Sequence, residues 1–240
     1  MIDLHNHILP GIDDGPGTLD ESLALARTAV SDGIKHMVVT PHIHPGRYDN
    51  QIATIEPVLQ RLQAALIEHS IPLTLTMGAE LRISAEMISM IPSGHVPFLG
   101  EWQGQKVLLL ELPHNHIPPG SDQLIRWLKS QNIIPMIAHP ERNKEIINNI
   151  DKINPFIEQG CLLQVTAMSV AGRFGDSAYT IAKELLARDW VTVLATDAHN
   201  LAHRPPILSE GVQAAAEIIG EAAAYRLVND TPEQIVFHHA

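Results

Sequence analysis

The sequence contains a single cysteine, Cys161, which excludes an intrachain disulfide and a cysteine-rich zinc site. Aromatic residues make up only 4% of the chain, so few side chains can stack on the bases of single-stranded nucleic acid. The formal net charge of −11 disfavours binding to a phosphate backbone. No apolar run reaches the roughly 18 residues of a membrane span, and no basic region followed by an apolar stretch opens the chain. We therefore expect a soluble cytoplasmic protein that neither inserts into a membrane nor binds nucleic acid.

The length and the pattern of apolar residues predict one α/β domain over residues 1–240. Hydrophobic residues make up 45% of the chain, and barrels of about 200–250 residues commonly form one domain. Short apolar runs alternate with longer amphipathic segments, which is typical of repeated βα units. The expected strands lie near residues 1–5, 36–40, 73–79, 106–112, 133–138, 161–166 and 190–196. The expected helices lie near residues 19–32, 51–69, 121–131, 144–159, 177–188 and 206–224. Seven strands fit either a closed barrel or an open doubly wound sheet.

Two helix starts are marked by their residues. Thr18 with Glu21 has the spacing of a capping box before the first helix. Thr231 and Pro232 predict a short final helix, because proline is favoured at the first helical position.

His5 and His7 end the first expected strand with one residue between them. Strand residues spaced by two point to the same face, so both imidazoles can bind one metal ion. Asp3 shares their spacing and can orient a ligand, although a structural carboxylate is the simpler interpretation. The segment 10–16 that follows has the composition of a turn. Its position after the two histidines makes one of its aspartates a candidate ligand.

Nearly every other expected strand also ends in a side chain that binds metals. These side chains are His42, Glu80, Glu111, His139, Asp197 and His199. Taken singly, a charged residue at a strand end often marks the return to solvent, and a lone histidine is more often packed or on the surface. Six strands with the same ending, always His, Asp or Glu and never Lys, favour a site for divalent metals. Chemistry at the carboxyl ends of strands is also typical of TIM-type barrels.

The charge of the candidate ligands indicates several metal ions. The nine candidates are His5, His7, Asp14, His42, Glu80, Glu111, His139, Asp197 and His199. Their four carboxylates contribute −4 and three divalent ions contribute +6, which leaves +2 to balance a phosphate dianion. Arg142 and Arg204 follow two of the histidines, and arginine binds phosphate through two parallel hydrogen bonds. An exposed loop arginine is otherwise only a surface charge.

These residues resemble those of the polymerase and histidinol phosphatase (PHP) superfamily. The resemblance is closest to the bacterial manganese-dependent protein-tyrosine phosphatases of capsule and exopolysaccharide operons. The matching stretches are MIDLHNHILPGIDDGP, TPHIHPGRYDN, GAE, LLLELP, AHPERN and TDAHN, which span residues 1 to about 204 in the family's order. The opening stretch and the HPER stretch are specific to this subgroup. Asn143 departs from the pattern, because an aromatic residue commonly follows HPER, and this leaves the local substrate contact open.

The resemblance implies a distorted (β/α)₇ TIM-like barrel, the PHP fold, with three divalent metal ions. Manganese is the expected ion, and iron and zinc are the alternatives. One metal would be held by His5, His7, Glu80 and Asp197, a second by Glu80, Glu111 and His139, and a third by Asp14, His42 and His199. Glu80 would then bridge two ions, and Arg142 and Arg204 would surround the phosphate as catalytic residues.

The resemblance also implies a phosphoric monoester hydrolase that acts on phosphotyrosine by attack of a metal-bound hydroxide. The usual substrate of such enzymes is the tail of a bacterial tyrosine autokinase that controls capsule or exopolysaccharide synthesis. Cysteine-dependent tyrosine phosphatases carry an arginine six residues after the nucleophile, whereas Ala167 stands six residues after Cys161. Cys161 is therefore expected to be a buried strand residue.

Two other functions stay open at this point. One is a PHP phosphoesterase that acts on histidinol phosphate or another small phosphorylated metabolite. The other is a non-catalytic binding module, whose mark would be missing ligands, and no proposed ligand is missing. The metal, the oligomeric state (a homo-oligomer among the options), the specific phosphoprotein and the general acid are not fixed by the sequence.

Overall fold

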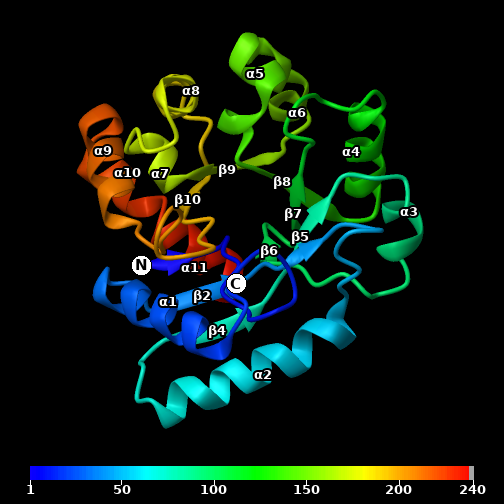
Figure 1. The fold of residues 1–240 in the computed structure, drawn as a ribbon. Coiled ribbons are helices and arrows are strands. Elements are labelled where there is room, and N and C mark those ends of the chain that lie inside the picture. The colour runs from blue at the N-terminus through cyan, green and yellow to red at the C-terminus, as the bar shows by residue number, and fades with distance from the viewer. Residues whose placement is uncertain (238–240) are drawn as a thin grey trace.

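Seven parallel strand segments form a ring in the computed structural model, which describes residues 1–237 (Figure 1). Two of the seven are each interrupted and carry two labels. The segments are β1 (Ile2–Asp3), β2 (His36–Val39) with β3 (His42–Ile43), β4 (Thr74–Met77) with β5 (Glu80–Arg82), β7 (Gln105–Glu111), β8 (Ile133–Ala138), β9 (Leu162–Thr166) and β10 (Val193–Ala195). The sequence predicted all seven. Residues 238–240 of the expected domain lie outside the described part.

The ring is a closed barrel rather than an open sheet. Strand β1 pairs with β2 and β2 with β4, while β3 pairs with β5 and the order then runs through β7, β8, β9 and β10. The ends of β10 and β1 meet at a parallel bridge between Asn6 and Ala198. There the amide of His7 donates to the Ala198 carbonyl at 2.8 Å. The predicted seven-stranded βα barrel is confirmed.

The interruptions explain why the barrel is distorted. Pro41 separates β2 from β3 and has no N–H to contribute to the strand pairing. A hairpin of β6 (Gly100–Trp102) against β7 adds one antiparallel strand, which the sequence analysis missed. Its two turn residues, Gln103 and Gly104, have φ values of 52° and 76°, as a type I′ turn requires.

Helices surround the barrel (Figure 1). They are α1 (Leu19–Ser31), α2 (Ile52–Glu68), α3 (Met87–Met90), α4 (Ser121–Ser130), α5 (Lys144–Asn148), α6 (Asn154–Glu158), α7 (Ala167–Val170), α8 (Asp176–Ala187), α9 (Ser209–Ile219), α10 (Glu221–Arg226) and α11 (Asp230–Phe237), with two 3₁₀ turns at Pro140–Arg142 and Ile150–Ile153. The capping box of Thr18 and Glu21 is present at the start of α1. None of the helices between residues 1 and 237 has the length and apolar character needed to cross a bilayer.

Two expected helices are each broken. The segment 144–159 divides at Asn149, which is extended and accepts a hydrogen bond from the Asp151 amide to start a new turn. The segment 206–224 begins later, at Ser209, and divides at Gly220, whose φ of 84° ends α9. The final helix α11 begins one residue before Thr231, so Pro232 is not at its first position.

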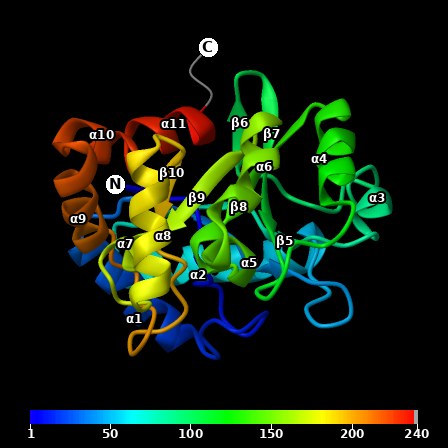
Figure 2. The same cartoon turned by 90° about the horizontal axis from the view of Figure 1, so that it is seen from above.

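The core has two parts, and the smaller one fills the barrel. Its buried side chains are Leu4, Val38, Leu99, Val107, Leu109, Ile134, Met136, Ala138, Val193 and Ile235. Ile235 comes from α11, which lies against β6 and β1 across the end where the strands begin (Figure 2). A Cβ on Gly100 would collide with the Ile235 carbonyl, which shows how closely α11 is packed there. Because apolar side chains close this end, polar side chains can gather only at the opposite end.

Candidate metal centre

Four buried donor atoms surround one point where the strands end. His5 Nε2 lies 3.3 Å from His7 Nε2, from Glu80 Oε2 and from Asp197 Oδ1. His7 Nε2 lies 3.4 Å from the same two carboxylate oxygens. Ligands on a tetrahedral ion with bonds of about 2.0–2.1 Å are separated by about this distance. The donor atoms of His5, His7 and Glu80 all lie within 4.8 Å of one another, and Asp197 contacts the two histidines without joining that group. Glu80 Oε2 is also buried without a hydrogen bond from any of residues 1–237, so the donor set fits a bound cation.

Hydrogen bonds behind the histidines direct these donors inward. His5 Nδ1 donates to Gln164 Oε1 at 2.8 Å, and His7 Nδ1 donates to Asp13 Oδ2 at 2.7 Å. His199 Nδ1 donates to the backbone carbonyl of Asp197 at 2.8 Å. When these rings are neutral, the single proton is on Nδ1 and the lone pair of Nε2 is free, which is the state in which imidazole binds a metal.

Asp13 and Gln164 were missed by the sequence analysis. Asp13 also accepts hydrogen bonds from the amides of Gly15 and His42, and so its carboxylate is held in place. Gln164 Oε1 also accepts from the His139 amide at 3.1 Å. Gln164 is a polar residue inside the buried strand β9, and a buried polar side chain needs a hydrogen-bond partner. Its position in the sequence could therefore have indicated a contact with a polar group inside the barrel.

Glu80 connects the first group to a second one. Its Oε1 lies 2.9 Å from His139 Nε2, while its Oε2 lies 2.9 Å from His42 Nδ1. Glu111 Oε2 lies 4.0 Å from that His42 nitrogen, and its other oxygen pairs with Arg82 at 2.8 Å. Glu80 and Glu111 are thus brought together with His42, a donor that the sequence analysis had not put in this group, while His139 contacts the other oxygen of Glu80.

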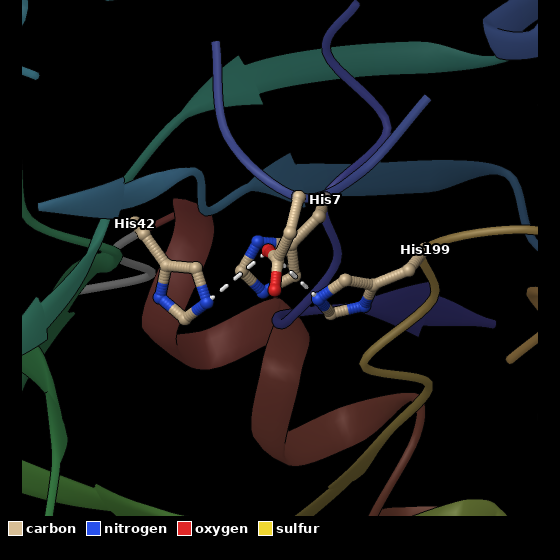
Figure 3. Close-up of side chains that lie close together, drawn as sticks. His7, His42 and His199 are labelled. Atoms are coloured by element: carbon tan, nitrogen blue, oxygen red, sulfur yellow. Dashed lines mark ion pairs between the residues drawn. The ribbon is translucent and has the colours of Figure 1, made fainter. Parts of the chain in front are cut away.

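A third group lies on the other side of His42. Asp14 Oδ1 lies 3.4 Å from His42 Nε2 and 3.3 Å from His199 Nε2. The ring of His7 stacks on that of His199, with the ring centroids 3.9 Å apart. Figure 3 shows these three imidazoles directed toward one another across a small space. All nine expected ligands therefore lie in one continuous cluster.

The charges of the cluster stabilise ionised carboxylates and a neutral histidine. Burial opposes ionisation of Glu80, but the charges of His5 and His42 hold its pKa well below the usual range. Burial also opposes ionisation of Asp197, and here Arg142 and His5 lower the pKa. Burial and the nearby Arg142 lower the pKa of His139 to about 4, so its ring is neutral at pH 7. Ionised carboxylates and neutral imidazoles are the forms that bind metals.

Two site residues have a strained backbone. His139 and Asp197 have φ values of 33° and 51°, in the left-handed region that residues with a side chain rarely adopt. His139 directly follows β8, and Asp197 lies two residues after the end of β10. Such strain costs of order 1–3 kcal/mol and persists where the surroundings enforce it, commonly at functional sites.

Arg142 and Arg204 converge on one oxygen of Asp197. Arg142 Nη2 lies 2.7 Å from Asp197 Oδ2, and Arg204 Nη1 lies 3.4 Å from it. Both arginines line a cavity of about 310 Å³ that opens over the donor cluster. The guanidinium of Arg142 also lies 5.3 Å from the centroid of the Phe174 ring, a contact that the sequence analysis missed.

Asp3 and Asn143 have structural positions. Asp3 accepts hydrogen bonds from the amide and the hydroxyl of Thr196, at 2.9 and 2.6 Å, and so joins β1 to β10. Asn143 caps α5 through its side-chain oxygen and donates to the carbonyls of Pro113 and His116.

Cys161 lies apart from this cluster. It is buried, and burial raises the pKa of its thiol to about 12. A thiol with this pKa is protonated at neutral pH and is a poor nucleophile.

Comparisons with known proteins agree with this geometry. The model of the family described as "Capsular polysaccharide synthesis, CpsB/CapC" matches residues 1–237. The chain is 34% identical to the tyrosine-protein phosphatase YwqE of Bacillus subtilis, over 96% of this chain and 89% of that protein. It is 28% identical to the tyrosine-protein phosphatase CpsB of Streptococcus pneumoniae, over 98% of each chain.

Solved structures give the same result. One of them belongs to a set of crystal structures of two metal-dependent tyrosine phosphatases, YwqE of Bacillus subtilis and CpsB of Streptococcus pneumoniae. It aligns with a TM-score of 0.92 and 33% identity, over 100% of this chain and 96% of the other. A histidinol phosphate phosphatase from Lactococcus lactis aligns with a TM-score of 0.57 and 13% identity, over 92% of this chain and 93% of the other, which shows a shared fold alone. This chain belongs to the CpsB/CapC family.

Proposed function

We propose that this chain is a metal-dependent protein-tyrosine phosphatase. The observation that carries the proposal is the buried set of donor atoms from His5, His7, Glu80 and Asp197, beneath a cavity lined by Arg142 and Arg204 among other residues. Each carboxylate oxygen of the set lies 3.3–3.4 Å from both imidazole nitrogens. The relatives YwqE and CpsB are tyrosine-protein phosphatases, and both cover most of this chain. Residues 1–240 would form one catalytic domain.

Three divalent ions would occupy the cluster, with Mn²⁺ as our first choice and iron or zinc as alternatives. The first would be held by His5, His7, Glu80 and Asp197, the second by Glu80, Glu111 and His139, and the third by Asp14, His42 and His199. His42 supports two of these sites, because its two ring nitrogens face different carboxylates. Such ions supply positive charge at the phosphate oxygens and lower the pKa of water, so that a nucleophile is available near neutral pH.

The chain's own residues would bind and orient the phosphate group. Arg142 and Arg204 each have a guanidinium at the cavity, where they can bind phosphoryl oxygens and stabilise the charge that develops on them. The leaving group is a phenolate with a pKa near 10, so it needs less protonation than an alkoxide. Asp13 and Gln164 would hold the histidines in their productive orientation.

We further propose that the substrate is the phosphotyrosine tail of a bacterial tyrosine autokinase that controls capsule or exopolysaccharide synthesis, and that the reaction takes place in the cytoplasm. The family description and the names of the relatives support the link to capsule synthesis. Whether the chain works as a homo-oligomer is a separate question, which analytical ultracentrifugation answers.

A panel of substrates tests the proposal. The purified chain is stripped with chelator and assayed with Mn²⁺, Zn²⁺, Fe²⁺ or no metal on a phosphotyrosyl peptide, a phosphoseryl peptide and histidinol phosphate. We expect metal-dependent turnover with the highest kcat/KM on the phosphotyrosyl peptide. A higher kcat/KM on histidinol phosphate would identify a small-metabolite phosphatase, and turnover without metal would contradict the role of the cluster.

A further inference from the structure

The four arginines that line the cavity are not equivalent. Arg82 pairs with Glu111 at 2.8 Å, and Arg142 and Arg204 pair with Asp197. Arg47 is exposed at the cavity edge, and none of residues 1–237 places a carboxylate oxygen within 4 Å of its guanidinium. Arg47 is therefore the lining arginine whose hydrogen-bond donors are available to a ligand.

A tight turn holds Arg47 in this position. The backbones of His44 and Tyr48 pair as an antiparallel bridge, with hydrogen bonds of 2.9 and 2.8 Å between them. Gly46 has a φ of 79°, and its amide donates to Asp49 Oδ1 at 2.7 Å. Because the turn is held at both ends, the backbone at Arg47 is held at the edge of the cavity.

Stacked rings connect this turn to the donor cluster. The ring of Tyr48 stacks on that of His42, with centroids 5.5 Å apart and planes 7° apart, and the Arg47 guanidinium lies 5.0 Å from the Tyr48 centroid. Arg47 thus lies within about 10 Å of the His42 ring, a distance spanned by about three extended residues. The Arg47 guanidinium contacts the Tyr48 ring but no carboxylate of residues 1–237, so its N–H groups remain for a carboxylate of the substrate.

The charge of the cavity favours an anion at this edge. Its four arginines are balanced by the four carboxylates of Asp14, Glu80, Glu111 and Asp197. The divalent ions of the proposed site then add positive charge that one phosphate dianion does not cancel.

From this arrangement we infer that Arg47 is a specificity-determining residue that binds an Asp or Glu side chain within three residues of the phosphotyrosine. The preferred substrate class is therefore an acidic phosphotyrosyl segment. This inference rests on the proposed function and adds to it the chemistry of the residues beside the scissile phosphate. It differs from the roles of Arg142 and Arg204, which act on the phosphate itself.

Matched peptides test the inference. Two phosphotyrosyl peptides are compared, one with Asp and Glu at the three positions on each side and one with Asn and Gln there. We expect the wild-type chain to prefer the acidic peptide by about two- to fivefold in kcat/KM, mainly through KM, as is typical of a single exposed ion pair. Arg47→Ala should abolish most of this preference, and higher salt should weaken it in the wild type. Arg61→Ala, an exposed arginine on α2 away from the cavity, is the control and should retain the preference.

A binding measurement separates this inference from catalysis. Fluorescence anisotropy with the same two peptides carrying a non-hydrolysable phosphonate should give the same ratio of affinities in the metal-loaded wild type, and a ratio near one in Arg47→Ala. Equal affinities in the wild type, a preference that survives Arg47→Ala, or an equal loss in Arg61→Ala would each overturn the role of Arg47. An absence of phosphotyrosyl turnover with any metal would instead refute the proposed function, and the anisotropy would still report on Arg47.

Discussion

Replacing Glu80 by glutamine removes one negative charge and one strong metal-binding oxygen while the side chain keeps its size. Glu80 is the residue shared by two donor groups. One oxygen lies 2.9 Å from His139 Nε2, and the other lies 2.9–3.4 Å from nitrogens of His5, His7 and His42. Glu80→Gln is therefore expected to weaken two of the three proposed metal sites at once.

The expected size of the effect follows from linkage between binding and folding. A metal present at 100 times its Kd stabilises the folded state by about 2.7 kcal/mol, so two sites contribute about 5 kcal/mol. For a domain of this length, 1 kcal/mol shifts Tm by about 2–4 °C. The rise in Tm on adding metal should thus be smaller by about 10–20 °C in Glu80→Gln than in the wild type. Since each variant is compared with its own metal-free form, other effects of the substitution cancel.

Metal content and turnover are measured on the same samples. Elemental analysis after gel filtration should show three ions per wild-type chain and about one per Glu80→Gln chain. The value of kcat/KM should fall at least about 100-fold, because even residues that only orient metal ligands cost 10- to 100-fold. Glu56→Gln, the same change at an exposed position on α2, is the control. Three ions and an undiminished Tm response in Glu80→Gln would refute the bridging role of this carboxylate.

Two further predictions concern phosphate binding and the nucleophile. Arg142→Ala or Arg204→Ala should lower kcat/KM by at least tenfold, which corresponds to about 1.4 kcal/mol of transition-state stabilisation. The metal content of these variants should not fall, because each guanidinium competes with a cation for Asp197. A loss of metal would instead show that the two arginines support metal binding. Cys161→Ser should retain most of its activity, and iodoacetamide should leave the wild type active between pH 7 and 9, since burial keeps the thiol protonated below its pKa of about 12. Inactivation at the rate of thiol alkylation would contradict a metal-based mechanism.

The positions of the candidate ligands were predictable because strand order and strand direction bring the strand ends together. His42, Glu80, Glu111, His139 and Asp197 each lie within two residues of the carboxyl end of a barrel segment, and all of them line the same cavity. The sequence pattern needed only the βα rhythm and the residue type at each strand end. Closure of the ring was not predictable in this way, since it depends on the contact between Asn6 and Ala198, which are distant in the sequence.

Roles that depend on a side chain's direction were not predictable. Asp13 and Asp14 are neighbours of the same type, yet Asp13 holds His7 from behind while Asp14 faces His42 and His199. The composition of the turn-like segment 10–16 does not distinguish them, and the expectation that Asp14 is the ligand came from the family resemblance. The same holds for His42, since strand position alone does not reveal that its two nitrogens face different groups.

The broken helices have a local cause that composition obscures. The segment 144–159 has the apolar spacing of one helix, but Asn149 interrupts it. The Asn149 side chain accepts a hydrogen bond from the Asp151 amide, which in a continuous helix would donate to the backbone carbonyl four residues earlier. This break lies immediately after the turn that carries Arg142 and the capped helix α5. The shorter elements keep that turn close to the barrel end.

The buried charges and the strained backbone of the donor cluster favour the binding of cations. Glu80 and Asp197 are both buried, and oxygens of both lie 3.3–3.4 Å from the same two imidazole nitrogens. Buried charges without partners are strongly destabilising, and nearby Arg142 and Arg204 both pair with Asp197 rather than with Glu80. Against the effect of burial, the charges of Glu80 and Asp197 raise the pKa of His5, so the carboxylates are balanced in part by a buried imidazolium, whereas burial and Arg142 keep His139 neutral at pH 7. The backbone strain at His139 and Asp197 adds to this cost. The buried charges and the strained backbone both destabilise the folded protein. Bound cations would offset this free energy, and the rise in Tm on adding metal measures by how much.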